Sequence, residues 1–234
     1  MNKKYVLTFD IDWAPDFMIS HCLNLLDQAN VRGTFFATHP TLINTEIINK
    51  GHILGIHPNF LSYNSKGKEP KTVIEECLSY APDAWCIRMH SLFQSSPLLH
   101  NIFQNFPQLK LDVSLLMHRS KYAHKCYWDY NGVSFERLLY NWDDCSEFCH
   151  QRFCSKEELF FGDLTVLNFH PVHVFLNSSN GKEYESLKEK CEGKPLPNVD
   201  FQTAKTFQNN GVGVKNHLEK ILKSKQICLT LDQL

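Results

Sequence analysis

The chain has 234 residues, of which 43% are hydrophobic, 12% aromatic and 21% charged, a balance that excludes a disordered or fibrous protein. Its formal charge of -1 comes without a dense basic cluster, which argues against a nucleic-acid partner. Because α/β barrels reach this length undivided, we expect a single catalytic domain over residues 1–234.

The beginning of the chain and its cysteines bear on the cellular compartment. Two lysines lead into an apolar stretch that acidic residues soon interrupt, and no apolar run approaches the roughly 18 residues of a membrane span. The nine cysteines are an odd number, so reduced thiols are expected. Cys145, Cys149, Cys154 and His150 lack the paired spacing of a structural zinc site, so we expect no metal there. These features predict a cytoplasmic protein without a membrane span.

Apolar runs rich in β-forming residues alternate with segments of helical spacing along the chain. Strands are expected over residues 5–9, 34–38, 53–56, 85–88, 109–113, 134–139, 164–168 and 226–231. Helices are expected over residues 17–29, 42–49, 72–80 and 97–105, with another after a flexible turn at 209–213. This alternation predicts a mostly parallel sheet covered by helices. About seven repeats favour a closed or nearly closed (β/α) barrel.

Two aspartates end the first predicted strand. Asp10 and Asp12 flank a single residue, so the period-two alternation of a strand points both carboxylates to one side. Two like charges placed so close are costly unless they hold a cation or take part in chemistry. The pair therefore predicts a metal-binding or catalytic role.

Other ionisable residues lie at the ends of later predicted strands. His57 precedes a proline in a polar turn, Arg88 and His90 are two residues apart, and His170 follows a late strand. Because the carboxyl ends of parallel strands share one face, these side chains are expected to converge with the two aspartates in one site. His52, before its strand, is expected to be an exposed structural histidine.

Taken together, these motifs resemble the polysaccharide deacetylases, the NodB-homology group of carbohydrate esterase family four. The resemblance rests on residues 8–12, 32–36, 51–57, 88–90 and 167–170, which occur in the family's order. The Phe-Asp-x-Asp-Trp-Ala segment and the His-Pro-Asn turn look closest to a branch associated with bacterial surface-polysaccharide clusters. The family implies an α/β fold, a distorted (β/α) barrel with about seven mostly parallel strands.

The resemblance also implies a reaction and roles for residues. A divalent metal, usually Zn²⁺, would assist hydrolysis of an N-acetyl or N-formyl amide on a sugar. Because the sequence shows no export signal, that sugar is expected to be a nucleotide-linked or lipid-linked precursor, or an oligosaccharide, and not finished wall polymer. Asp10 would be the general base, and Asp12 and His57 would be metal ligands. Arg88 would hold and tune the base, and His170 would be the general acid that protonates the leaving amine.

One departure from the family pattern concerns the metal site. The family's second metal histidine would fall at Leu61, and catalytic zinc usually has three protein ligands. Another side chain must complete the site if a metal is bound. His90 is the first substitute because its predicted strand position faces the base, and Asn59 is the second.

A late segment supplies the expected substrate contacts. Residues 140–144 resemble an aromatic-acidic segment that lines the groove or orients the catalytic histidine in such enzymes. Trp142 is expected to stack on a sugar ring, and Asp144 and Ser91 to contact the substrate. Asp112 could take the place of Asp144.

Two other functions remain open from the sequence. A strand followed by Asp10 and Asp12 also begins the haloacid dehalogenase phosphatases, although Trp13 and Pro15 follow here instead of a threonine-like residue. A degenerate carbohydrate-binding module without catalysis would tolerate Leu61. The presence of a base, an arginine and an acid together argues against that module.

Overall fold

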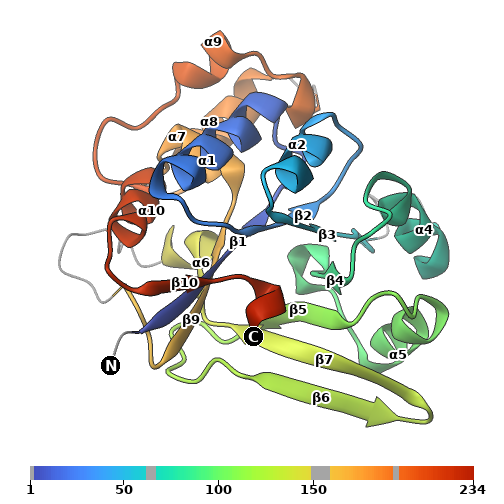
Figure 1. Ribbon diagram of the computed structural model, residues 1–234. Coiled ribbons are helices and arrows are strands. Elements are labelled where there is room, and N and C mark those ends of the chain that lie inside the picture. The colour runs from blue at the N-terminus through green and yellow to red at the C-terminus, as the bar shows by residue number, and fades with distance from the viewer. Residues whose placement is uncertain (1–2, 62–66, 149–158, 192–194) are drawn as a thin grey trace.

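The computed structural model describes residues 3–61, 67–148, 159–191 and 195–234 (Figure 1). Ten strands within these residues form one sheet in the order β6-β7-β5-β4-β3-β2-β1-β9-β8, with β10 also paired to β1. Every pair is parallel except β6 with β7, which confirms the predicted α/β fold with a mostly parallel sheet. The strands are β1 Lys4–Asp10, β2 Thr34–Ala37, β3 Ile53–Ile56, β4 Cys86–Ile87, β5 Leu111–Leu116, β6 Lys125–Tyr130, β7 Val133–Tyr140, β8 Trp142–Asp143, β9 Leu164–Phe169 and β10 Ile227–Leu229.

Strand β1 pairs with three other strands of the sheet. Along one side its first half pairs with β10, where Lys4 lies opposite Ile227, and its second half pairs with β2, where Thr8 lies opposite Thr34. Strand β9 pairs along the other side. Because these strands are parallel, the carboxyl ends of β1, β2, β3, β4 and β9 meet at one edge of the sheet.

The sheet curves, and the chain itself links strands near its two opposite edges. Strand β7 pairs with β5 and strand β8 pairs with β9, and only Asn141 separates β7 from β8. The Asn141 backbone N–H donates to the Val166 carbonyl at 3.1 Å, and the Asn141 side-chain oxygen accepts from the Val166 N–H at 2.8 Å. The result is a distorted barrel.

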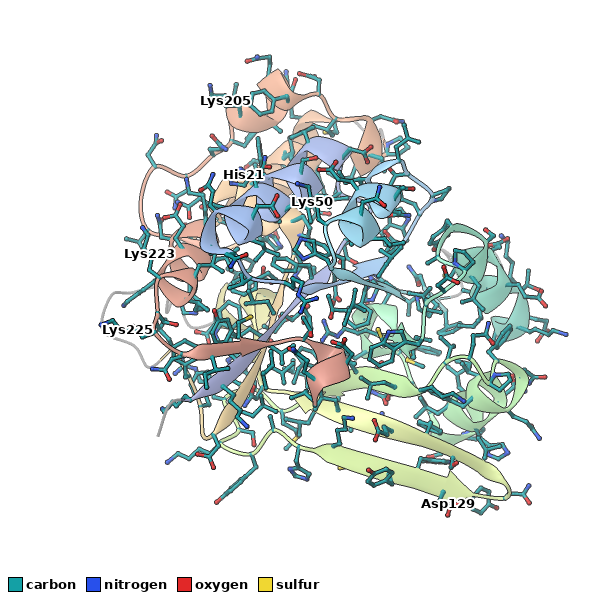
Figure 2. The ribbon with its side chains drawn as sticks, viewed as in Figure 1. His21, Lys50, Asp129, Lys205, Lys223 and Lys225 are labelled. Carbon is teal, nitrogen blue, oxygen red and sulfur yellow. The ribbon has the colours of Figure 1, made fainter. Side chains whose placement is uncertain are left out.

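Helices cover the outside of this barrel (Figure 1). They are α1 Asp16–Ala29, α2 Ile43–Asn49, α4 Pro70–Tyr80, α5 Ser96–Asn105, α6 Asp144–Phe148, α7 Pro171–Leu176, α8 Lys182–Lys190, α9 Phe201–Lys205 and α10 Val214–Leu222, with short 3₁₀ turns at His90–Leu92, Leu196–Asn198 and Leu231–Gln233. Helices α1, α7 and α10 pack on one another, and α4 packs on α5. The exposed lysines Lys50, Lys205 and Lys223 extend from the ends of outer helices (Figure 2). None of the helices in the described ranges combines the length and apolar character that a membrane span needs.

The alternation of side chains along β1 separates an outer from an inner apolar cluster. Leu7 and Phe9 belong to the large cluster beneath the helices. Val6 belongs to a second cluster, formed mainly by strand residues, that fills the barrel interior. Since alternate residues share a face, Thr8 and Asp10 follow Val6 inward. The barrel interior is therefore apolar at depth and polar at the edge where the carboxyl ends meet.

Two local features differ from the sequence expectations. The hairpin of β6 and β7 was not predicted, although its tight turn at Asn131 and Gly132, both with positive φ (49° and 76°), has the sequence typical of two-residue hairpins. His52 is buried rather than exposed, because its ring packs edge-on against Phe35. The seven cysteines within the described residues are free thiols. Cys149, His150 and Cys154 lie outside the described residues.

Candidate active site

Asp10 is the last residue of β1 and is held by two side chains, Arg88 directly after β4 and Asn168 in the neighbouring strand β9. One carboxylate oxygen accepts a hydrogen bond from the Arg88 guanidinium at 3.0 Å. The other oxygen accepts from the Asn168 amide at 2.9 Å. Asp10 is buried with 4% of its surface exposed, so both contacts are shielded from water. Its carboxylate is fixed in one orientation at the mouth of the barrel.

Asn168, at the penultimate position of β9, connects the charged groups of the interior. Its amide nitrogen also donates to Asp143 at 3.0 Å, and its oxygen accepts from Arg88 and from the Thr8 hydroxyl. The sequence reasoning did not single out Asn168 as a site residue. A signal was present, because Asn168 is two residues before His170 and a buried strand amide needs partners.

Arg88 crosses the barrel interior without contact with solvent. Its Nε donates to the Val113 carbonyl at 2.9 Å, and the guanidinium lies between the rings of Phe36 and Tyr140, at 4.6 Å and 4.3 Å from their centroids. A planar guanidinium can stack on aromatic rings and donate hydrogen bonds in its own plane. The arginine therefore fixes Asp10 and compensates its charge.

Asp12 does not continue strand β1, which corrects the alternation argument that placed it beside Asp10. The strand ends at Asp10, and Asp12 and Trp13 both have positive φ, 45° and 57°. The Ala14 N–H donates to the Ile11 carbonyl at 2.9 Å and closes a tight turn around them, and Trp13 N–H donates to the Thr38 hydroxyl at 2.9 Å. The left-handed turn brings the Asp12 carboxylate over the barrel mouth.

Three potential metal-ligand atoms converge above Asp10. Asp12 Oδ1 lies 3.2 Å from His57 Nε2 and 3.1 Å from His90 Nδ1, and the two ring nitrogens are 3.3 Å apart. Atoms that bind one tetrahedral cation with bonds of about 2.0–2.1 Å are separated by about 3.3 Å. These three atoms fit a Zn²⁺ ion in both spacing and chemistry.

The orientation of His57 supports this fit. Its Nδ1 lies 2.7 Å from the Arg88 carbonyl oxygen, which can only accept, so the proton is on Nδ1 and Nε2 faces Asp12. When His57 is neutral, it directs a lone pair at a carboxylate oxygen and at the His90 nitrogen. Converging lone pairs repel one another unless a proton or a cation lies between them. At metal sites, a ligating imidazole is commonly oriented by a hydrogen bond from its other ring nitrogen to a backbone carbonyl.

The charges of the site change the pKa of each of these groups. Burial alone would raise the pKa of Asp10, but Arg88, His57 and His170 outweigh it and lower the pKa below its usual value. Burial would likewise raise the pKa of Asp12, whereas its contacts with His57 and His90 lower it well below. Burial would lower the pKa of His57, but Asp10 and Asp12 raise it. Both carboxylates are therefore ionised at neutral pH.

His170, at the end of β9, lies on the other side of the two aspartates. Its Nε2 is 3.6 Å from Asp12 Oδ2 and 3.9 Å from Asp10 Oδ2. Its Nδ1 lies 2.6 Å from Asp144, which also accepts from the His170 backbone N–H at 2.8 Å. Burial by itself would lower the pKa of His170, but Cys145 and Asp144 raise it well above its usual value. A protonated His170 thus presents an Nε2–H to the barrel mouth.

The expected substrate contacts need two corrections. Trp142 is 1% exposed and stacks on His217 in the outer cluster, so its ring is not available to a sugar. Asp144 is fully buried behind His170 and orients that histidine instead of touching the substrate. Ser91 is exposed and lines the cavity at the barrel mouth. Asp112 pairs with Arg137 at 2.7 Å, so it neither lines this cavity nor orients His170.

The position of Leu61 also constrains the third ligand. The Leu61 N–H donates to the Asn59 side-chain oxygen at 3.0 Å. Because that oxygen already accepts a hydrogen bond, Asn59 is less suited to bind a cation than His90, whose Nδ1 lies within the group of converging atoms.

A cavity of about 340 Å³ opens over these groups. Its polar floor contains Asp10, Asp12, His57 and His170. Its walls include the apolar side chains of Leu92 and Leu116. A cavity of this size suits a small ligand and combines an apolar wall with converging polar groups, as binding sites commonly do.

Comparisons with known proteins show what the chain is similar to. The sequence model of a family described as WbmS-like polysaccharide deacetylase matches residues 7–188. A solved protein of Bordetella bronchiseptica, described as a polysaccharide deacetylase involved in O-antigen biosynthesis, is 28% identical with a TM-score of 0.77, over 94% of this chain and 90% of that one. No curated protein sequence matches the chain.

More distant solved structures share the fold. The peptidoglycan deacetylase PdaC of Bacillus subtilis is 11% identical with a TM-score of 0.51, over 99% of this chain and 89% of that one. The Xyl-CE4 domain of a xylanase from the hindgut metagenome of Trinervitermes trinervoides is 13% identical with a TM-score of 0.50, over 100% of this chain and 89% of that one.

Proposed function

The chain belongs to the WbmS-like polysaccharide deacetylases, and we propose that it hydrolyses the N-acetyl amide of a sugar used in surface-polysaccharide synthesis, with a divalent cation as cofactor. The observation that carries the proposal is the convergence of two groups at one barrel mouth. One is Asp10 fixed by Arg88, and the other is Asp12 with His57 and His90. Family membership and the histidines around the two aspartates leave the phosphatase alternative without support.

Asp12, His57 and His90 would hold the cation. Two imidazoles and a carboxylate are a common ligand set of catalytic Zn²⁺, and an open position remains for substrate or water. When bound, such a cation polarises the amide carbonyl and lowers the pKa of the attacking water. The lower pKa allows a weakly basic carboxylate to accept a proton from that water.

Asp10 is the proposed general base. Its lowered pKa keeps it ionised at neutral pH, and Arg88 and Asn168 hold its two oxygens in place. The carboxylate accepts the proton of the attacking water as the new C–O bond forms. Since Arg88 is itself fixed by Val113 and two aromatic rings, little reorganisation accompanies this proton transfer.

His170 is the proposed general acid. An amine is a poor leaving group, so the amide C–N bond breaks only as its nitrogen gains a proton. The raised pKa of His170 supplies a protonated Nε2 near neutral pH, and Asp144 keeps the ring turned toward the cavity. The products are the free amino sugar and a carboxylate.

Acetate release tests the proposal directly. Protein loaded with Zn²⁺ and protein stripped with a chelator are incubated with N-acetylglucosamine, N-acetylgalactosamine, their UDP derivatives and disaccharides that contain them. We expect acetate from the loaded protein alone, and none from Asp10→Asn. Stoichiometric zinc binding without acetate release from any of these compounds would instead favour a carbohydrate-binding module.

A further inference from the structure

Strand β6 is the end strand of the sheet, and its outer edge is unpaired. Within the described ranges it pairs with β7 alone, in antiparallel pairing that runs from Lys125 opposite Leu138 to Tyr130 opposite Val133. Figure 1 shows β6 at the lower margin of the molecule. An exposed strand edge presents N–H and C=O groups on which a strand of another chain can pair.

The register of the hairpin decides which backbone groups of β6 face outward. Tyr130 and Val133 close the two-residue turn, so they form a hydrogen-bonded pair. Opposing residues of an antiparallel pair alternate between hydrogen-bonded and non-hydrogen-bonded pairs. The N–H and C=O groups of Lys125, Tyr127 and Asp129 therefore point away from β7, toward the free edge.

The side chains of these three residues lie on one face of β6, because they are alternate residues of a strand. Tyr127 is 80% exposed, and Asp129 is exposed near the hairpin turn (Figure 2). Asp129 forms no ion pair within the part of the chain that the structure describes. Lys125 pairs with Glu136 of β7 at 2.6 Å, and 24% of its side chain is still exposed, so the lysine can meet a second carboxylate.

A second copy of the chain fits this edge. When Tyr127 lies opposite Tyr127 of a second copy in antiparallel pairing, Lys125 of each copy lies opposite Asp129 of the other. Every outward N–H and C=O group of the three residues then has a partner. Aromatic pairs and opposite charges at directly opposing positions stabilise a sheet. A shift of the register by two residues in either direction would separate the charges.

We propose that two copies of the chain associate by antiparallel pairing of their β6 strands, which joins the two sheets edge to edge. The inference is independent of the proposed reaction, since β6 contributes no residue to the catalytic cavity. The twofold match of lysine and aspartate selects a second copy over an unrelated strand. Each copy contributes one short strand, so the dimer should be reversible and depend on protein concentration.

Sedimentation velocity of the full chain over a series of protein concentrations tests the inference. The wild-type protein should pass from monomer to dimer as the concentration rises. Asp129→Lys places like charges opposite one another at both ends of the interface, so the dissociation constant of the dimer should rise about 10-fold or more. Glu189→Lys makes the same change of charge at an exposed position of α8, and it should leave the dissociation constant unchanged.

Disulfide cross-linking tests the register. Opposing residues of a hydrogen-bonded pair have Cα atoms about 5.5 Å apart, within the range of roughly 4.4–6.8 Å that a disulfide allows. In a Cys126→Ser background, Tyr127→Cys should therefore link two copies under mild oxidation. Tyr130→Cys also introduces an exposed cysteine on β6, but it does not lie opposite its counterpart and should not add a link.

Three results would overturn the inference. They are a protein that stays monomeric at every concentration, a dimer that Asp129→Lys does not weaken, and equal cross-linking of Tyr127→Cys and Tyr130→Cys. Circular dichroism shows whether Asp129→Lys is folded. If that variant does not fold, the comparison of the two cysteine variants decides.

Discussion

The two ends of strand β3 carry one histidine each, and they differ in almost every respect except burial. His52 precedes the strand and is 5% exposed, and His57 follows it and is 3% exposed. The His52 Nδ1 accepts from the Gly33 N–H at 3.1 Å, and burial lowers the pKa of the ring, so His52 is a neutral structural residue. At His57 the two aspartates reverse the effect of burial on the pKa.

The difference follows from strand direction. In a parallel sheet the carboxyl ends of β1, β4 and β9 lie together, so side chains that are distant in sequence converge only at that edge. The same residue type at the opposite end of β3 packs against Phe35 and a backbone amide. Residue identity and burial alone therefore do not distinguish a functional histidine from a structural one in this fold.

The largest effect on catalysis should come from the base. Asp10→Asn keeps the size of the side chain but removes the charge that accepts a proton, so kcat should fall by about 10⁴. Zinc content should stay near one per chain, because Asp10 lies outside the three converging atoms. Asp12→Asn should lose both activity and zinc. Equal zinc contents in the two variants, measured by elemental analysis, would contradict this division of roles.

Metal affinity tests the different roles of His52 and His57. His57→Ala and His90→Ala should each weaken Zn²⁺ binding by more than about 100-fold. Removing a residue that supports a metal ligand lowers metal affinity by about 10–100-fold, and removing the ligand itself should lower it further. His52→Ala should leave zinc affinity unchanged and lower stability, since the Gly33 amide loses its acceptor. Competition with a chromogenic chelator gives the affinities. Full zinc occupancy in His90→Ala would exclude His90 as a ligand.

The pH profile tests the proposed acid. His170 acts protonated, and its raised pKa keeps it protonated above pH 6.5, so the rate should fall only on the alkaline side of neutrality. Asp144→Asn removes a negative charge beside the ring, which lowers the pKa of His170. The alkaline limb of kcat/KM should move to lower pH, and kcat near neutrality should fall by about 10–100-fold. His170→Gln should lack this limb. An unchanged profile in Asp144→Asn would mean that another group is the acid.

The smallest effect on catalysis should follow from Trp142. Trp142→Leu should lower the free energy of unfolding by about 2–4 kcal/mol, because the indole fills the outer cluster and stacks on His217. KM should be unchanged in the folded fraction, since the ring does not reach the cavity. Urea unfolding and steady-state kinetics measure the two quantities. A large rise in KM with unaltered stability would restore the sugar-stacking role expected from the sequence.

Much of the barrel could be predicted from periodicity. Strands β1, β2 and β3 are short apolar runs buried on both faces, and acidic or polar residues mark their carboxyl ends. The order of these ends then places Asp10, His57 and His170 together without any knowledge of distances. This part of the site follows from topology, and topology follows from the alternation of strands and helices.

The burial of Trp142 could not be predicted in this way, because it depends on a local break in that periodicity. Tyr140 faces the barrel interior and Trp142 faces the helices, although residues two apart on a regular strand share a face. The phase changes at Asn141, where the chain leaves β5 and pairs with β9. A two-residue strand such as β8 has too few side chains to show a period, so the burial of Trp142 was not visible in the sequence.

The left-handed turn at Asp12 and Trp13 has a consequence for how the protein folds. A non-glycine residue in this conformation costs roughly 1–2 kcal/mol, so the turn is unfavourable until β1 and β2 have paired and Thr38 can bind the Trp13 amide. We therefore expect that in a nascent or partly folded chain the Asp12 carboxylate is not held over the barrel mouth and the three converging atoms are apart. We expect metal uptake to follow folding instead of guiding it, so that added Zn²⁺ leaves the refolding rate unchanged and slows unfolding alone.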